Sequence, residues 1–203
     1  MATNNQSVFQ EYVTPEEVNA LPLTYYDGKI VLIQSPDKIE QAVDEINQFS
    51  VVGFDTETKP TFVKGQFYHI SLIQIAVPGK VFLFRINNSG YTQPLIDLFS
   101  NENILKVGVG LRDDIIGLQK IQPFEAAGFE EIHKYVIDLG VRNTGLRKLA
   151  AILMKVRISK GQQTSNWENP VLTKNQESYA ATDAWICLEM YNLLDEKGFV
   201  YQD

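Results

Sequence analysis

The stretch Val51-Val52-Gly53-Phe54-Asp55-Thr56-Glu57 is an apolar run that ends in two acids. Its β-branched and aromatic residues are typical of a buried strand, where a bare carboxylate is costly. Side chains two positions apart on a strand point to the same face, so Asp55 and Glu57 present oxygens to one point in space. The pattern indicates half of a divalent-metal site. A strand that simply ends at Phe54, followed by two solvated acids, is the commoner explanation of an isolated motif of this kind.

A second apolar segment, Lys106–Leu111, is followed by the adjacent acids Asp113 and Asp114 and by apolar positions at helical spacing. Acids at a helix start complement its dipole and cap free N–H groups, which explains one of the two. The other is free to face a cleft at the end of the strand. The third glycine of a dinucleotide-binding fingerprint is missing here, which excludes that interpretation.

The segment from Glu177 to Leu194 lacks proline and glycine and predicts a long C-terminal helix. Tyr179 and Asp183 are four positions apart, so they lie on one face of this helix. Taken alone, the tyrosine is explained as a core aromatic and the aspartate as a surface acid. Their position after the two earlier acidic motifs favours a shared site instead.

Taken together, these motifs resemble the DEDD superfamily of 3'-5' exonucleases. The tyrosine in the third motif places the resemblance in the DEDDy subclass, most similar to the Werner-type exonuclease domain and more distantly to ribonuclease D. The similarity extends from about Ile30 to about Leu194 and is not confined to the acids. It also includes the segments Ser71–Ala76, Val81–Phe84, Val107–Gly110 and Ser165-Asn166-Trp167.

The resemblance implies a metal-dependent enzyme that hydrolyses phosphodiester bonds from the 3' end and releases nucleoside 5'-monophosphates, with DNA favoured over RNA. Two divalent ions, Mg²⁺ or Mn²⁺, would be held by four acids, and Tyr179 would orient the attacking water or assist its deprotonation. The four acids are Asp55, Glu57, Asp114 and Asp183. A ribonuclease D-like exoribonuclease, a catalytically silent nucleic-acid-binding module and a phosphohydrolase acting on small nucleotides remain alternatives.

Several residues outside the acids are expected to contact nucleic acid 3' ends, in single strands or at recessed duplex ends. They are Thr58, Lys160, Ser165, Asn166 and Trp167. The net charge of -7 is unlike that of a protein that binds polyphosphate tightly. Between Leu139 and Trp167, however, there are six basic residues and no acid, which indicates either a local substrate contact or a solvated basic helix face. The sequence therefore predicts weak, salt-sensitive binding to short ends.

The order of elements predicts an α/β fold with a mixed sheet flanked by helices, which the resemblance specifies as ribonuclease-H-like. Residues 1–28 are expected to form an N-terminal arm that packs against the domain or partly floats, and residues 29–203 a single exonuclease domain. The expected strands are 29–33, 51–56, 69–77, 80–86, 104–109 and 134–138. Helices are expected after Ser35-Pro36 and near 92–100, 112–121, 145–154 and 177–194.

The bulk properties suit a compact enzyme. At 203 residues with 44% apolar composition, the chain is large enough for one domain with a core. The first ten residues carry no evident secretion signal, and no stretch approaches a membrane span. The single cysteine, Cys187, excludes an internal disulfide. We therefore expect a cytoplasmic protein with no membrane association.

Overall fold

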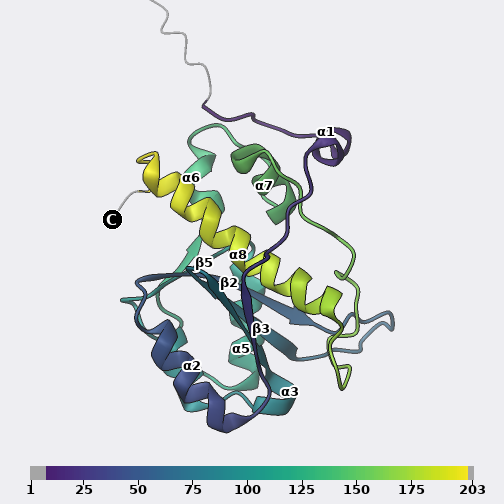
Figure 1. Cartoon of the computed structure of the whole chain (residues 1–203), viewed down its shortest axis with the longest axis vertical. Helices are drawn as coiled ribbons and strands as arrows, with labels where there is room; N and C mark the ends of the chain where they lie inside the picture. Colours follow the sequence, from purple (N-terminus) through teal and green to yellow (C-terminus); the bar gives the residue numbers. More distant parts are fainter. Residues whose placement is uncertain (1–7, 201–203) are drawn as a thin grey trace, which may run out of the picture.

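The computed structural model describes residues 8–200, which form one mixed sheet with helices on both faces (Figure 1). The strands within this range are β1 Lys29–Ile33, β2 Val51–Thr58, β3 Ile70–Val77, β4 Lys80–Arg85, β5 Leu105–Gly108 and β6 Phe129–Glu131. Their spatial order is β1-β4-β3-β2-β5-β6. Strand β3 is antiparallel to β2 and β4, whereas the β1–β4, β2–β5 and β5–β6 pairs are parallel. The predicted mixed α/β sheet is confirmed.

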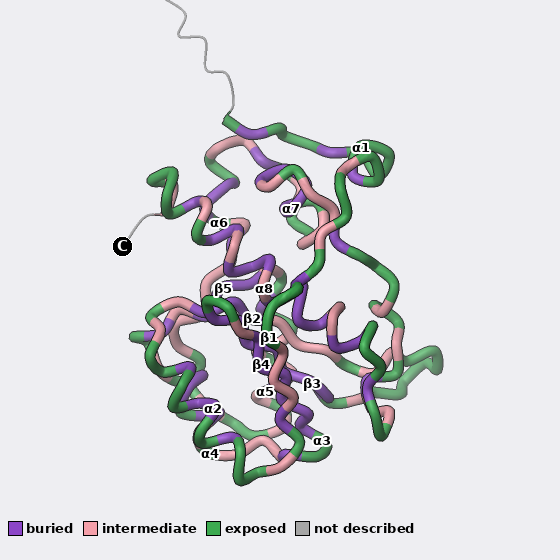
Figure 2. The backbone as a smooth tube through the Cα atoms, viewed as in Figure 1, coloured by how far each residue is buried: buried purple, intermediate pink, exposed green. Residues whose placement is uncertain are grey.

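Helices divide between the two faces of the sheet. They are α1 Pro15–Ala20, the 3₁₀ turn η1 Pro36–Lys38, α2 Ile39–Ile46, α3 Ile86–Ser89, α4 Gln93–Phe99, α5 Leu111–Ile121, α6 Ile132–Ile137, α7 Leu146–Met154 and α8 Lys174–Glu196. Helices α2, α4 and α5 share a core with one side of β2, β3 and β4. The long helix α8 crosses the other side, with α6 and α7 packed against it (Figure 1). Figure 2 shows the buried backbone concentrated in α8 and the strands beneath it.

Alternation along β2 decides which residues face α8. Val52 and Phe54 belong to the core beneath α2 and α4, so the odd-numbered positions of β2 point toward α8. Gly53 is one of them, and a Cβ atom there would collide with the carbonyl oxygen of Ala184 on α8. The buried alanines Ala180 and Ala184 complete this close packing. Glycine and alanine therefore bring the backbone of α8 directly onto β2, two residues before Asp55.

One predicted strand is wrong. Residues 134–138 do not form a strand, because α6 occupies Ile132–Ile137 and the last strand is β6, Phe129–Glu131. Ile132, Tyr135 and Val136 are buried at helical spacing in the core shared with α7 and α8. Tertiary packing of this stripe outweighs the strand preference of the Tyr-Val-Ile run.

The described part of the N-terminal arm packs against the domain. Phe9, Val13 and Val18 are buried in the core beside α7 and α8, and α1 opens with a capping box between Thr14 and Glu17. Residues 1–7 of the predicted arm lie outside the described residues. No helix within residues 8–200 is long and apolar enough to cross a membrane. The cytoplasmic location stays a prediction.

Candidate active site

Three acids meet where α8 crosses the end of β2. Asp55 and Glu57 project from the α8-facing side of the strand, and Asp183 comes from the helix. One carboxylate oxygen from each residue lies within 4.8 Å of the others. The same-face placement predicted from the Asp-x-Glu spacing is thus found, and the third acid comes from the predicted helix. Hard divalent cations take oxygen ligands in such an arrangement.

The acids strongly perturb one another. Burial, followed by the charges of Asp183, Asp114 and Glu57, raises the pKa of Asp55 well above its ordinary value. Burial, Asp183 and Asp114 raise the pKa of Glu57 to about 9. Burial raises the pKa of Asp183 to about 7, against the lowering effects of the Tyr179 hydroxyl and the Arg147 charge. Without a cation the cluster holds protons at neutral pH, so a bound divalent ion would relieve both the burial cost and the repulsion.

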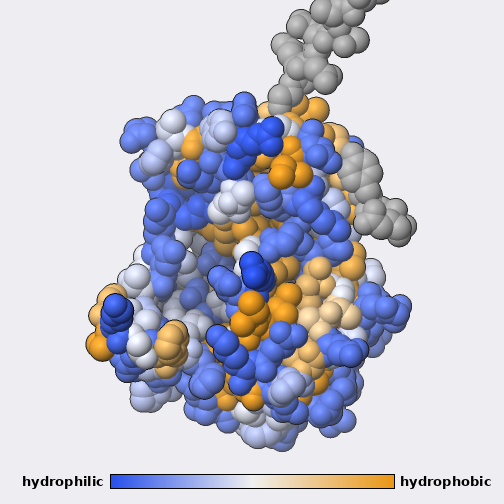
Figure 3. Space-filling view, turned by 180° about the vertical axis from the view of Figure 1, so that it is seen from behind, coloured by the Kyte–Doolittle hydropathy of each residue, from blue (hydrophilic) through white to orange (hydrophobic). Residues whose placement is uncertain are grey.

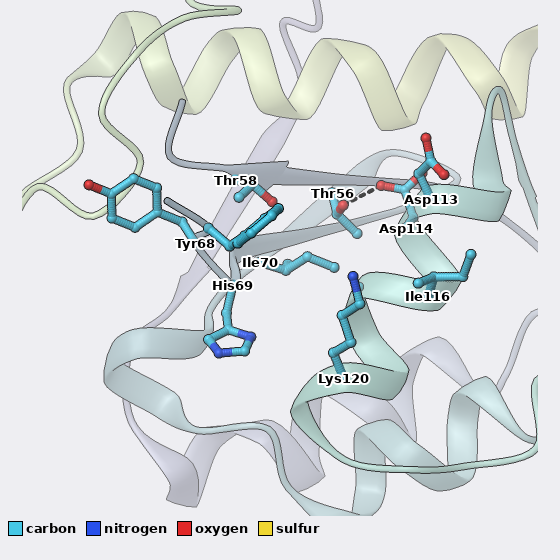
Figure 4. Close-up of a pocket in the computed structure, with 11 residues that line it drawn as sticks. Thr56, Thr58, Tyr68, His69, Ile70, Asp113, Asp114, Ile116 and Lys120 are labelled. Carbon is cyan, nitrogen blue, oxygen red and sulfur yellow. Dashed lines mark hydrogen bonds between the residues drawn. The ribbon is translucent and has the colours of Figure 1, made fainter. Parts of the chain in front are cut away.

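The structure distinguishes the adjacent acids at the start of α5. Asp114 is half-buried and accepts a hydrogen bond from the Thr56 hydroxyl on β2, as Figure 4 shows. Burial raises the pKa of Asp114 to about 6, although this hydrogen bond lowers it. Asp113 is exposed to solvent. Asp114 is therefore the acid that approaches β2, beside the group of Asp55, Glu57 and Asp183 rather than within it.

Tyr179 lies one helical turn before Asp183. Burial, then the charges of Asp183 and Glu57, raises the pKa of its hydroxyl above the ordinary value. The hydroxyl therefore stays protonated at neutral pH and is available as a hydrogen-bond donor beside the acids. Its ring packs against Trp167, with the ring centroids 6.0 Å apart.

Trp167, which was predicted to contact nucleic acid, has no exposed surface in the structure. Its side chain is fully buried in the core beneath α8, together with Leu72 and Ala180. The indole contributes by packing behind the Tyr179 ring. A tryptophan in a polar loop gives no sequence signal that separates contact with nucleic acid from packing in the core.

A cavity of about 670 Å³ opens over the acids. Its lining includes Asp55, Glu57, Tyr179, Asp183 and the predicted contact Lys160. The other predicted contacts lie elsewhere. Thr58 lines a cavity on the opposite side of β2. Ser165 accepts a hydrogen bond from the Gln176 amide, and Asn166 accepts one from the Glu168 backbone, so these side chains serve local loop structure.

Further residues of this cavity were not predicted individually. Arg147 and Lys148, at the start of α7, line it together with Lys160 and provide three positive charges opposite the acids. The acid-free basic segment was the sequence signal for them. Other bases of this segment point elsewhere. The Arg142 Nε atom lies 3.6 Å from a Glu11 carboxylate oxygen, and the Arg157 Nε–H donates to the Leu21 carbonyl. Helix α1 adds Pro15, Val18 and Asn19, which places the N-terminal arm at the edge of the site.

An acidic cluster on a strand and a long helix, with a tyrosine one turn from the last acid, is the arrangement that the resemblance of the three sequence motifs to 3'-5' exonucleases implies. A family model described as 3'-5' exonuclease matches residues 30–198, and the chain belongs to this family. The resemblance of the sequence motifs to 3'-5' exonucleases is confirmed.

The sequence is similar to curated exonucleases and ribonucleases. The chain is 31% identical to the mouse bifunctional 3'-5' exonuclease/ATP-dependent helicase WRN, over 97% of this chain and 15% of that protein. It is 30% identical to ribonuclease D of Haemophilus influenzae, over 74% of this chain and 37% of that protein. It spans between 15% and 54% of the first three curated relatives that it matches.

Solved structures agree with the fold. The Nibbler EXO domain of Aedes aegypti superposes with a TM-score of 0.76 at 25% identity, covering 88% of this chain and 92% of that one. Ribonuclease D of Trypanosoma brucei in complex with RNA U12 superposes with a TM-score of 0.72 at 19% identity, covering 83% of this chain and 63% of that one. The ribonuclease-H-like architecture is thus the architecture of known exonucleases.

Proposed function

We propose that this chain is a metal-dependent 3'-5' exonuclease that removes nucleoside 5'-monophosphates from the 3' ends of nucleic acid. The observation that carries the proposal is the group formed by Asp55, Glu57 and Asp183 in a cavity that also holds Tyr179. The membership of the family supports the reaction class. A silent binding module would have no need to hold three mutually repelling carboxylates together.

The donor set fits hard divalent cations, Mg²⁺ or Mn²⁺. Asp55, Glu57 and Asp183 would hold one ion, and Asp55 with Asp114 would support a second. Two such ions supply activation of the attacking water and stabilise charge on the attacking and leaving oxygens of an in-line displacement. The chain itself supplies the geometry, because β2 and α8 are rigid elements held in contact by Gly53 and Ala184.

Tyr179 would act as a donor rather than as a base. Its raised pKa keeps the proton on the hydroxyl, so the group can hold the attacking water or a phosphate oxygen by a hydrogen bond. Trp167 fixes the ring from behind. This role positions a reactant and needs no change in the charge of Tyr179.

The basic residues across the cavity would hold the phosphates of the strand that enters. Arg147 donates its Nε–H to the Ile158 carbonyl at 2.9 Å, which leaves the remaining guanidinium donors for a phosphate. Lys148 and Lys160 line the same space. Much of the remaining surface is hydrophilic, as Figure 3 shows from behind, and the net charge is negative. Affinity that depends on a few cations should fall as salt rises.

DNA is proposed as the preferred polymer, with RNA as a second candidate. The resemblance of the motifs to the Werner-type exonuclease domain favours the first, and the alignment to WRN covers 97% of this chain. The similarity to ribonuclease D supports the second.

Matched DNA and RNA oligonucleotides, labelled at the 3' or the 5' end, test the proposal with Mg²⁺, Mn²⁺ or EDTA. The expected result is a metal-dependent ladder that shortens from the 3' end and is absent for Asp55→Asn. The Asp195→Asn variant is the matched control, because Asp195 is an exposed acid near the far end of α8. Cleavage that survives in Asp55→Asn, or no cleavage of either polymer in any metal, would refute the proposal.

A further inference from the structure

A second cavity, of about 680 Å³, is drawn in Figure 4. It lies on the opposite side of β2 from the acid cluster, because Thr56 and Thr58 alternate with Asp55 and Glu57 along the strand. It is bounded by β2, by the start of β3 and the loop before it, and by α5. Thr56 and Thr58 line this cavity, whereas Asp55 and Glu57 line the first one. Asp114 also lines the second cavity, and its hydrogen bond to Thr56 forms part of the wall between the two. The volume is in the range of sites that hold small organic ligands.

The cavity has opposite charges at its two ends. Asp113 and Asp114 lie at the start of α5, and Lys120 lies near its end, about 9 Å further along the helix axis. Figure 4 shows the Lys120 side chain extending into the space between Ile70 and Ile116. Within residues 8–200, no ion pair or hydrogen bond engages the Lys120 ammonium. A cation is thus available at one end and hydrogen-bond acceptors at the other.

The lining between these ends combines apolar side chains with Thr58 and His69, and an aromatic ring lies at its edge. Ile70 and Gly117 form part of the lining, and a Cβ atom at position 117 would lie 2.8 Å from the Ile70 side chain. Phe67 also lines the cavity, and 86% of its surface is exposed. An exposed aromatic ring and a free cation in one cavity form a combination with which proteins bind single nucleotides of a strand, by stacking on the base and neutralising the phosphate.

The loop that carries Phe67 is tied to the rest of the molecule. The Lys59 ammonium forms an ion pair with Glu168 at 3.0 Å and lies 4.5 Å from the centroid of the Tyr68 ring. These contacts link the start and the end of the loop to the segment before α8. The Phe67 ring is therefore presented at a defined edge of the cavity.

We propose that this second cavity binds one nucleotide of the nucleic-acid substrate, separate from the nucleotide that is removed. The base would stack on Phe67, the phosphate would lie at Lys120, and amino or hydroxyl donors of the nucleotide would face Asp113. The inference rests on the proposed exonuclease function. The nucleotide belongs either to the strand being cut, upstream of its last two nucleotides, or to the paired strand of a recessed duplex.

Two variants test the cavity, each with a matched control. Lys120→Gln removes the ammonium, and Lys38→Gln removes an exposed lysine on the distant η1 turn. Phe67→Ala removes the ring from the cavity, and Phe62→Ala removes an equally exposed ring from the same loop that does not line it. All four side chains are exposed, so thermal stability should stay close to that of the parent protein.

The readouts are kcat/KM on a dinucleotide, a single-stranded decamer and a recessed duplex, and binding of the longer substrates to the Asp55→Asn protein by fluorescence anisotropy. Lys120→Gln and Phe67→Ala should weaken binding and lower kcat/KM by about fivefold or more on at least one longer substrate, with the dinucleotide unaffected. A loss on the decamer assigns the site to the cut strand, and a loss confined to the duplex assigns it to the paired strand.

Equal behaviour of each variant and its control on every substrate would overturn the proposal, as would an equal loss on the dinucleotide. Failure of the proposed function is seen separately, as absence of cleavage by the parent protein. In that case, binding of the longer substrates, measured with both substitutions in the Asp55→Asn background, would still compare Lys120→Gln with Lys38→Gln.

Discussion

Asp183→Asn should stabilise the metal-free protein while it abolishes cleavage. The wild-type carboxyl is buried in a cluster with Asp55 and Glu57, and its pKa rises from 3.8 to about 7. That rise means that the charged form is disfavoured in the folded state by about 4 kcal/mol. Asparagine has nearly the same shape and no charge, so the variant should gain up to about this amount in free energy of unfolding at pH 8.

The gain should depend on pH in a defined direction. Because the folded pKa lies above the unfolded one, the unfolded wild-type chain loses its Asp183 proton first as the pH rises, and wild-type stability falls between about pH 4 and pH 7. The asparagine side chain of the variant would not titrate in this range. The difference in stability between variant and wild type should therefore be small at pH 4, grow up to pH 7 and stay constant above it.

Urea unfolding in EDTA at pH 4.5 and pH 8 measures both quantities. Asp195→Asn, on the exposed part of the same helix, should change stability by less than about 0.5 kcal/mol at either pH. Two outcomes would refute this reasoning: Asp183→Asn is less stable than the wild type at pH 8, or the two proteins differ in free energy of unfolding by the same amount at both pH values. Either result would show that favourable local bonds to the Asp183 carboxylate outweigh its burial and its repulsion by the neighbouring acids.

Three further changes probe the same contacts. Tyr179→Phe keeps the packing on Trp167 but removes the donor, so kcat should fall on the order of 10²-fold with unchanged thermal stability; unaltered turnover in steady-state kinetics would remove the hydroxyl from the mechanism. Gly53→Ala should cost about 1–3 kcal/mol in urea unfolding and lower activity, because the new methyl group meets the Ala184 carbonyl; wild-type stability would contradict that close approach. Saturating Mg²⁺ at pH 8 should raise the midpoint of thermal unfolding, with reversal by EDTA and a smaller rise in Asp55→Asn; equal rises would place the ion elsewhere.

Local patterns were sufficient for most of the fold and for the acids. The same-face spacing of Asp55 and Glu57 in β2 and the apolar stripe of α5 each express a period that follows from backbone geometry. The Pro78-Gly79 pair, a typical turn sequence, joins β3 to β4. The error at α6 arose where β-forming residues and a helical burial stripe coincide in one short segment. Only packing against α7 and α8 separates the two, and packing is not visible in the segment itself.

Burial of polar and aromatic groups was the part that sequence could not provide. Arg85 is buried and donates to the Pro170 carbonyl at 2.7 Å, and Lys106 is buried and donates to the Asn101 carbonyl at 2.7 Å. Both look like surface residues in the sequence. The motif resemblance selected Asp114 over Asp113, but the contact that distinguishes the two acids is made with Thr56, a residue 58 positions away. Helix α1 could have been found, because Thr14-x-x-Glu17 is a capping-box pattern.

The packing of α8 explains how the chain keeps mutually repelling acids together. Asp183 lies on the same helix as Ala180, Ala184 and Leu188, which are buried against the sheet, so the helix cannot move away without exposing that face. Burying the Leu188 side chain contributes about 1.5–3 kcal/mol and each alanine methyl group about 0.8 kcal/mol, so together they offset part of the cost of the buried carboxyl groups. The distance between the acids is therefore set by small residues in the core. Leu188→Ala should then lower activity as well as stability, although Leu188 contacts no substrate in this proposal, because the helix that carries Asp183 would settle differently on β2. If Leu188→Ala is less stable but cleaves at the wild-type rate below its unfolding temperature, the site is held by the acids' own bonds and not by this packing.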